Sequence, residues 1–437
     1  MVRKSLFAFV VFGLAVSCKP KYESPEISSG EIDPARFVMI GGSQVAGYSD
    51  DALTYSGQVN SLAALIAGQL SKVGGGVFNQ PLVSESSVGV SLTGLSVLQL
   101  GYKTDCEGTS SLSPVRKAIA GDVSVWNDLL YSNASPFGNF GVPGVRLDQL
   151  QLQGLSADNT FFSRFASSGT ASVIDDAVSA DPTFFALFAG LDELVAYAKS
   201  GATIGTLPST SEFQSSYASV LSALTMNGAK GVIATLPDVT QMPYFTTIPY
   251  NGLALTSENA DDLSLLNNIY NPLGYYFDYG NNPFMVVDST ANFVAVRQAM
   301  PGELLSLAIP LDSVKCHQMG VLYPFRDEFV LDQLELNVLR AHIKNYNNAI
   351  RSLADQFNLA LVDTEEFYVS LNDGFVYNGV TMSSKFVSGG AYSLDGIQLN
   401  ARGNALLANA FLKAMNAKYR SKIPFLNPME FNGPVFP

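Results

Sequence analysis

The sequence predicts an α/β protein in which a mainly parallel sheet is covered by helices on both faces. Two observations lead to this class: short, continuous apolar runs typical of buried strands, and amphipathic segments with helical spacing between them. Strands that alternate with helices indicate a three-layer α/β/α arrangement. The chain has 437 residues, of which 47% are hydrophobic and 14% charged, so it can bury a large core. At this length we expect one large domain with insertions, or two domains.

Four apolar runs predict buried strands, and they lie at 37–40, 184–190, 231–237 and 359–363. Four segments with apolar residues three and four apart predict helices, and they cover 59–73, 211–226, 332–357 and 401–418. In the third of these helices, Leu334, Leu339, Ile343 and Ile350 are expected to be buried. The region from 74 to about 133 is polar and glycine-rich and shows no strong periodicity.

The first residues predict a lipoprotein signal peptide over 1–17. Arg3 and Lys4 form a charged start, and the apolar stretch 6–16 is too short to span a bilayer. Small residues then precede Cys18, a pattern that resembles a lipobox and implies that Cys18 carries the lipid. The alternative is an ordinary signal peptide with a chance cysteine. Residues 18–35 predict a flexible tether, since proline, serine, glutamate and lysine have little to bury, and 36–437 then form the folded domain.

A lipid on Cys18 would attach the protein to the outer membrane, on its periplasmic face or at the cell surface. An outer-membrane β-barrel or another envelope protein is then a candidate partner, although the sequence does not name one. The net charge of −13 argues against nucleic acid and against electrostatic docking on anionic lipid. We expect neither a cofactor nor a metal.

Two further cysteines, Cys106 and Cys316, lie in segments with the composition of loops. Two thiols in an exported protein often pair, so a disulfide between them is one expectation and two free thiols the other. Cys316 and His317 could also form a nucleophile–base pair. Adjacent residues on a strand point to opposite faces, which disfavours that pair.

Four short segments, taken in order, resemble sequence blocks of the SGNH/GDSL hydrolase superfamily, in particular its large lipoproteins of the Bacteroidota type. They lie at 37–50, 139–144, 188–193 and 393–400, and framework segments at 234–239 and 243–249 also resemble the family. The resemblance covers most of 36–437. It implies an SGNH-hydrolase-like, flavodoxin-like α/β/α domain with large loop insertions.

The resemblance also implies a catalytic site with two altered positions. Ser43 matches the nucleophile, Gly144 a backbone donor of the oxyanion hole, and Asp395 the residue that orients the base. Asp192 stands where the family has an asparagine that donates to the oxyanion, and an ionised carboxylate cannot donate. Gln398 stands at the histidine of Asp-x-x-His, and a carboxamide cannot act as a general base. One lost oxyanion donor alone costs about 10²–10³ in rate.

The matching residues also have structural interpretations. Ser43 can cap the segment after it, Gly144 can serve through its backbone angles, and Asp395 can hold the loop before the last helix. Gln44 follows Ser43 where the family usually has an apolar residue. The two histidines are His342, expected on a helix, and His317, expected in a loop from which it could reach Ser43 only with an unusual chain order.

These observations lead to three hypotheses about function. The first is a lipid-anchored envelope protein with a hydrolase-like fold and an impaired site, which binds a protein, glycan or lipid. The second is an esterase acting on acyl or acetyl esters through Ser43, with a base other than residue 398. The third is an accessory subunit whose cleft is filled by side chains.

Overall fold

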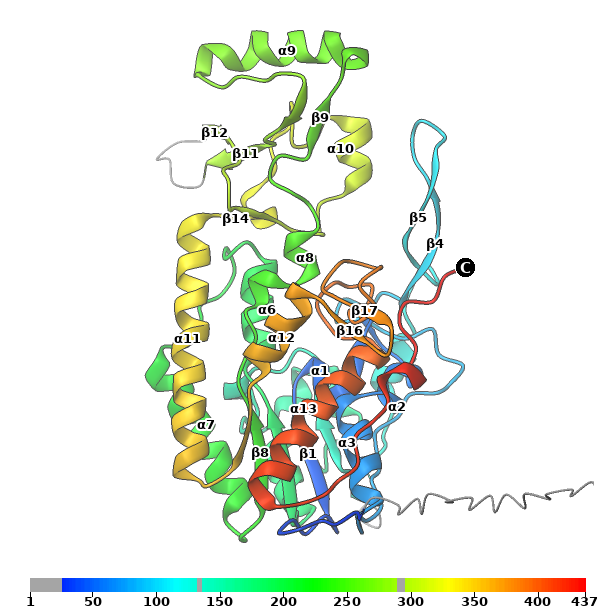
Figure 1. The fold of residues 1–437 in the computed structure, drawn as a ribbon, viewed down its shortest axis with the longest axis vertical. Helices are drawn as coiled ribbons and strands as arrows, with labels where there is room; N and C mark the ends of the chain where they lie inside the picture. The colour runs from blue at the N-terminus through cyan, green and yellow to red at the C-terminus, as the bar shows by residue number, and fades with distance from the viewer. Residues whose placement is uncertain (1–25, 132–135, 289–294) are drawn as a thin grey trace, which may run out of the picture.

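The computed structural model describes residues 26–131, 136–288 and 295–437. Figure 1 shows a helix-covered sheet with a smaller group of elements beyond one end of it. The expected signal peptide 1–17, the lipid-bearing Cys18 and the first part of the tether lie outside the described residues. Among the described residues, no helix is both long and apolar enough to cross a membrane.

Five parallel strands form the central sheet, in the order β15-β8-β7-β1-β6. Their bounds are β1 Phe37–Gly41, β6 Asn139–Gly141, β7 Phe184–Phe188, β8 Lys230–Ala234 and β15 Ala360–Val362. Of the five sheet strands in chain order, the second, β6, pairs on one side of β1 and the third, β7, on the other. This is the flavodoxin-like order, whose switch point lies between the first and third strands. The α/β/α fold expected from the sequence is confirmed.

Strands β1 and β7 run in register from Phe37↔Phe184 to Gly41↔Phe188, and every residue in both is buried. Because both strands are apolar on both faces, they need helices above and below. Their carboxyl ends lie side by side, so the segments that follow β1 and β7 begin at one edge of the sheet. Ligand sites of such sheets form at this edge.

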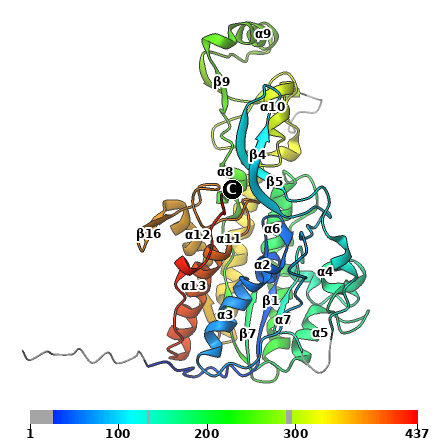
Figure 2. The ribbon, with the colours of Figure 1, turned by 90° about the vertical axis from the view of Figure 1, so that its right-hand side faces the viewer.

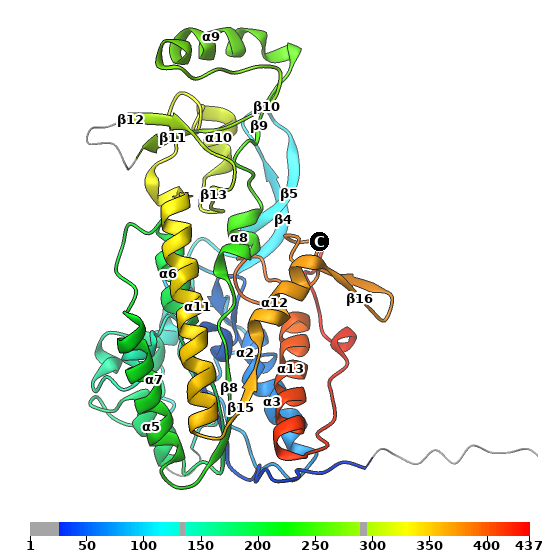
Figure 3. The same cartoon turned by 60° about the vertical axis from the view of Figure 1, so that its left-hand side comes forward.

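Helices cover both faces of the sheet (Figures 1 and 3). On one face α7 (Thr210–Thr225) packs against α11 (Gln333–Gln356), and on the other α3 (Leu62–Ser71) packs against α13 (Ala401–Tyr419). The remaining helices beside the sheet are α1 (Ser43–Ala46), α2 (Tyr55–Val59), α4 (Thr160–Ser163), α5 (Val173–Ser179), α6 (Leu191–Lys199) and α12 (Thr364–Asp373).

Two sequence expectations about helices were wrong in detail. The helix expected over 59–73 is broken, because the Ser61 side chain accepts a hydrogen bond from the Ala64 N–H and starts α3 there. In α11, which Asp332 caps, Leu334 is 65% exposed while Leu336 is buried. The buried face of α11 therefore passes through Leu336 in the first turn of the helix, on the same side as Leu339 and Ile343.

The cap is the group of elements between 247 and 331, apart from 289–294. It contains β9 Leu253–Leu255, α9 Ala260–Tyr270, β10 Gly280–Asn282, β11 Met285–Asp288, β12 Ala295–Gln298, β13 Leu304–Leu305, α10 Leu311–His317 and β14 Val330–Leu331. Two small apolar clusters, one around Phe325 and one around Tyr270, hold it together. Helix α8 (Pro243–Thr246) leads into the cap from the sheet domain (Figure 1).

A long hairpin, β4 (Leu98–Thr104) with β5 (Ser110–Arg116), reaches from the sheet domain up to α10 of the cap (Figure 2). The sequence shows no strong periodicity in this region and did not predict the hairpin. Most hairpin side chains are exposed or half-buried on both faces, so the apolar alternation that marks a strand is missing. A second small hairpin, β16 (Phe375–Tyr377) with β17 (Val380–Met382), precedes α13.

Candidate active site

Three of the motif residues follow neighbouring strands and meet at the carboxyl edge of the sheet. Ser43 follows β1 and is the first residue of α1, with only 3% of its surface exposed. Gly144 follows β6 with φ of +74°, and Asp192 lies in the first turn of α6 after β7. Strands β1 and β7 are neighbours in the sheet although they are far apart in the sequence. The segments that follow them therefore bring Ser43 and Asp192 together at the switch point.

Asp192 accepts hydrogen bonds from both of its partners in this cluster. The Ser43 backbone N–H lies 3.2 Å and 3.1 Å from the two carboxylate oxygens of Asp192, and the Ser43 hydroxyl donates to Asp192 Oδ1. The Gly144 N–H lies 3.1 Å from Asp192 Oδ1 and 3.1 Å from Ser43 Oγ. We call Ser43, Gly144 and Asp192 the closed hole.

The closed hole has the donors of an oxyanion hole, but a carboxylate of the protein itself occupies them. In acyl transfer, two backbone N–H groups beside the nucleophile bind the oxygen that becomes negative. Here the N–H groups of Ser43 and Gly144 both point at Asp192. The amino-terminal end of α6 also favours a negative charge at Asp192. A substrate carbonyl could reach these donors only if Asp192 left them.

Gly42 makes room for this carboxylate. A Cβ atom added at Gly42 would lie 1.8 Å from Asp192 Oδ2, far inside van der Waals contact. The backbone angles of Gly42 are −95° and −145°, so the reason for glycine here is close approach and not a left-handed conformation. The backbone before Ser43 is thus fitted to a carboxylate at position 192.

Two neighbouring acidic groups at this edge have raised pKa values. Burial raises the pKa of Asp192 to about 6, against the hydrogen bonds from Ser43 and Gly144, which lower it. Burial, together with the negative charge of Asp192, raises the pKa of Glu193 to about 7. Glu193 Oε1 accepts from the Leu147 N–H at 3.3 Å, and Glu193 Oε2 is buried without a hydrogen-bond partner.

Asp395 is a structural acceptor. Its Oδ1 accepts from the N–H groups of Ile397 and Gln398, both at 2.8 Å, and its Oδ2 accepts from the Asp51 N–H at 3.1 Å. Burial raises the pKa of Asp395, while these three donors oppose the rise. Asp395 thereby holds the turn before α13 and fastens it to the segment after β1.

Gln398 and Gln44 also have structural positions. The Gln398 side chain is 6% exposed, and its Oε1 is buried without a hydrogen-bond partner. The Gln44 side chain is buried, accepts from the Leu399 N–H at 3.2 Å and donates to Asn404 Oδ1. The polar residue after Ser43 therefore ties α1 to the start of α13.

Neither histidine of the chain is bonded to Ser43. His317 is exposed at the end of α10 in the cap, where it lines a different, open pocket together with Tyr323 and Arg326. His342 lies on α11, its Nδ1 is 2.9 Å from the Val338 carbonyl oxygen, and its ring contacts Tyr346. The hydrogen bonds of Ser43 Oγ in the described structure go to Asp192 and Gly144.

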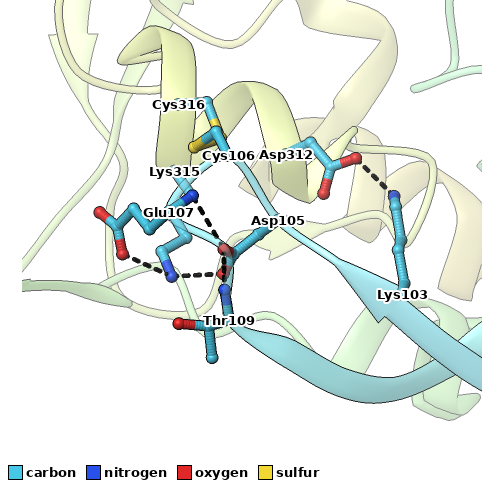
Figure 4. The surroundings of a disulfide bond; sticks show 8 residues. All are labelled: Lys103, Asp105, Cys106, Glu107, Thr109, Asp312, Lys315 and Cys316. Carbon is cyan, nitrogen blue, oxygen red and sulfur yellow. Dashed lines mark hydrogen bonds and ion pairs between the residues drawn. A yellow bond between two sulfur atoms is a disulfide. The ribbon is translucent and has the colours of Figure 1, made fainter.

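Cys106 and Cys316 are joined in a disulfide that links the turn of the β4–β5 hairpin to α10 (Figure 4). The expectation of a loop around Cys316 was wrong, because Cys316 lies within the helix α10 and His317 ends it. Lys315 forms ion pairs with Asp105 at 2.5 Å and Glu107 at 2.8 Å beside the disulfide. These contacts fix the hairpin against the cap.

A pocket of about 640 Å³ lies between the hairpin, the cap and the segment of Asp395. We call it the cap pocket. Its lining includes Tyr244, Lys199, Leu311 and Asp395, but not Ser43. Its volume is in the range of small-molecule sites. The N–H donors at Ser43 and Gly144 are filled by the Asp192 carboxylate, whereas this neighbouring space is open.

The structure thus brings Ser43, Gly144 and Asp192 into one cluster and places Asp395 and Gln398 in the adjoining turn. Sequence reasoning missed Glu193, the role of Gln44 as a clamp and the cap pocket. Glu193 follows Asp192 directly, and a pair of acids in a largely apolar segment was the available signal. Among the described residues no group of three or more histidine, cysteine or acidic side chains is arranged to hold a metal.

Comparison with known proteins adds little at the level of the site. No family model and no curated protein matches the chain. Solved structures with some likeness include LAE5, an α/β hydrolase enzyme from the metagenome of Lake Arreo, Spain, at 12% identity and a TM-score of 0.37, covering 89% of this chain and 97% of that chain. Another is the acetyl xylan esterase AlAXEase, at 15% identity and a TM-score of 0.27, covering 63% and 78%. At such values neither likeness carries an argument, so the fold is assigned from the strand order.

Proposed function

We propose that this chain is a lipid-anchored envelope protein with an SGNH-hydrolase-like fold whose hydrolytic site is shut, and that it acts by binding. One observation carries the proposal: the carboxylate of Asp192 accepts hydrogen bonds from the N–H groups of Ser43 and Gly144. An oxyanion hole already filled by an anion cannot stabilise a second one beside it. The missing histidine at Gln398 removes the base as well.

The remaining base at Ser43 is Asp192 itself, to which the hydroxyl donates. If Asp192 took the serine proton, it would still occupy the two N–H groups that the tetrahedral intermediate needs. The esterase alternative therefore requires the Asp192 carboxylate to move away from the N–H groups of Ser43 and Gly144. The following test distinguishes this alternative from the proposal.

Hydrolysis of a short acyl ester by the purified protein tests the proposal. We expect no turnover above that of Ser43→Ala, and little from Gln398→His alone, because Asp192 still fills the hole. Gln398→His combined with Asp192→Asn should exceed either single variant, since groups that act as one catalytic unit are not additive. Turnover by the native protein that disappears in Ser43→Ala would overturn the proposal.

Attachment by lipid has its own test. Replacing Cys18 with Ser should move the protein from the membrane fraction to the soluble fraction, because the acyl chains supply the affinity. A matched Ser17→Ala variant keeps the small residue before Cys18 and should stay attached. Mass spectrometry that finds an unmodified N-terminus downstream of Cys18 would contradict the anchor.

A further inference from the structure

The roof of the cap pocket is held at several points. The Cys106–Cys316 disulfide joins the hairpin to α10, and Lys103 pairs with Asp312 at 2.5 Å on the same two elements (Figure 4). Lys315 adds its two ion pairs to the hairpin turn. Hairpin and α10 therefore form a fixed arch over the pocket, which limits the ordering that a ligand must impose on binding.

The floor of the pocket is fastened to the sheet domain. The Tyr244 N–H donates to the Gly396 carbonyl oxygen at 3.0 Å, and the Leu307 N–H donates to the Tyr244 carbonyl oxygen at 2.9 Å. Tyr244 thus links the turn before α13 with the cap. Asp395 lies in the same turn, with both carboxylate oxygens held by backbone N–H groups.

Much of the pocket wall is apolar. Its apolar side chains come from the hairpin, from the first residue of α10 and the segment before it, and from the segment before α13, and they include Leu98, Leu307, Ile309, Leu311, Phe386 and Leu394. Because these side chains come from separate elements fixed to one another, they form a lined cavity that can bury an apolar chain or ring.

Among the described residues, the charged side chains of the wall pair with one another except Lys199 and Asp395, and the Asp395 carboxylate accepts its hydrogen bonds from backbone N–H groups. Of the four basic residues that line the pocket, Lys103, Arg116 and Lys315 each pair with an acidic side chain. The fourth, Lys199, has no acidic partner in the described part of the chain, and its Nζ lies 5.1 Å from the centre of the Tyr244 ring. Lys199 is therefore a cation available to a ligand, held beside an aromatic face.

We propose that the cap pocket binds an anionic amphiphile, a molecule with one apolar chain or ring and one anionic group, and that Lys199 pairs with the anionic group. The proposal rests on the proposed function in one respect: the pocket retains its ligand and does not deliver it to Ser43. The chain carries a net charge of −13, so long-range attraction favours cations. A preference for an anion must therefore come from the pocket itself.

Calorimetric titration of the purified protein with three probes tests this. Decanoate has both the apolar chain and the anionic group, acetate has only the group, and decyltrimethylammonium has a similar chain with a cation. We expect saturable binding of one decanoate, no detectable binding of acetate, and decyltrimethylammonium at least about tenfold weaker than decanoate. Failure of decanoate to saturate, or equal affinity of the two long-chain probes, would overturn the proposal.

Charge variants locate the binding. Lys199→Gln should weaken decanoate binding about fivefold, within the range of exposed ion pairs. Lys199→Glu should reverse the preference toward decyltrimethylammonium. Lys344→Gln, an exposed lysine on α11 without a described ion pair, is the matched control and should change nothing. If both glutamine variants behave alike, Lys199 does not hold the anion and the proposal is wrong.

A variant of the apolar wall tests the other half of the ligand. Leu311 lines the pocket with 58% of its surface exposed, so Leu311→Asp should fold and should weaken decanoate binding at least about tenfold. Unchanged affinity in Leu311→Asp would place the chain elsewhere and contradict the assignment. Ester turnover by the native protein would contradict the proposed function but would not change what these titrations measure. Failure of the proposed function and failure of the pocket proposal can therefore be told apart.

Discussion

The closed hole and the cap pocket lie at the same edge of the sheet and use their charges in opposite ways. In the closed hole, the carboxylate of Asp192 accepts hydrogen bonds from the N–H groups of Ser43 and Gly144, so these donors are occupied. In the cap pocket, the paired side chains leave Lys199 without an acidic partner among the described residues. On our proposal, binding takes place in the space beneath the cap and the hairpin and not at the filled donors of the closed hole.

Asp395 lines the cap pocket and holds the turn before α13, and removing it should have the largest effect on stability. Asp395→Ala leaves the N–H groups of Asp51, Ile397 and Gln398 without their acceptor, so we expect a loss of about 3 kcal/mol in the free energy of unfolding. Urea denaturation measures it. Asp395→Asn keeps one carbonyl oxygen and should lose less. Equal stability of Asp395→Ala and the native chain would show that this turn does not depend on the carboxylate.

Gly42 tests the closed hole by crowding it. Gly42→Ala should destabilise the fold by about 2 kcal/mol, because the new methyl group meets the Asp192 carboxylate. Gly68→Ala is the matched control: this exposed glycine in α3 has nothing within 4 Å of an added Cβ, so alanine should stabilise by up to about 1 kcal/mol.

The double variant makes the test specific to Asp192. Gly42→Ala combined with Asp192→Ala should recover part of the loss, because the clashing carboxylate is gone. Thermal or urea unfolding of the four combinations gives the coupling. Strictly additive losses would mean that the methyl group clashes with the backbone and that Asp192 is not the reason for glycine at position 42.

The pH dependence of stability should differ between the native chain and Asp192→Asn. The folded-state pKa of Asp192, about 6, lies above its ordinary value of 3.8, so the folded state binds this proton more tightly. The stability that this proton contributes is fully present below about pH 4 and is lost as the pH rises through about 6. We expect Asp192→Asn to lack this loss, a difference of about 2–3 kcal/mol.

Urea unfolding at pH 4 and pH 7 measures the difference. Burial also raises the pKa values of Asp50, Glu193 and Glu335, each to about 7, and these groups titrate in both proteins. Comparing the two proteins therefore isolates Asp192 from them, apart from its coupling to the neighbouring Glu193. If the native chain and Asp192→Asn lost the same stability between the two pH values, the pKa of Asp192 would lie near its ordinary value and its carboxylate would not be buried as described.

Much of the sheet could be predicted from sequence because its strands are buried on both faces. The runs at Phe37–Gly41 and Phe184–Phe188 are short and continuously apolar, a pattern typical of central parallel strands. The β4–β5 hairpin could not be predicted, because its stability comes from a disulfide and ion pairs with a cap that is distant in sequence. Local pattern does not record such long-range contacts.

The motif residues were identified through the resemblance of four short segments to a known family, whereas the role of one of them depends on the fold. A carboxylate at position 192 could be identified as unable to donate from chemistry alone. In the fold, this carboxylate accepts hydrogen bonds from the N–H groups of Ser43 and Gly144. This role depends on the register of β1, β6 and β7, which places the segments after these strands side by side. The cap pocket likewise depends on how three separate elements meet.

The most direct measurement of the closed hole is the reactivity of Ser43 toward a fluorophosphonate, followed by intact-protein mass. The serine oxygen would bond to phosphorus and release fluoride, which requires both a base and a donor for the phosphoryl oxygen. We expect the native protein to remain unmodified under conditions that label a control serine esterase, and Asp192→Asn with Gln398→His to gain a single adduct at Ser43. A stoichiometric adduct on the native protein that is absent in Ser43→Ala would show that Asp192 does not shut the site.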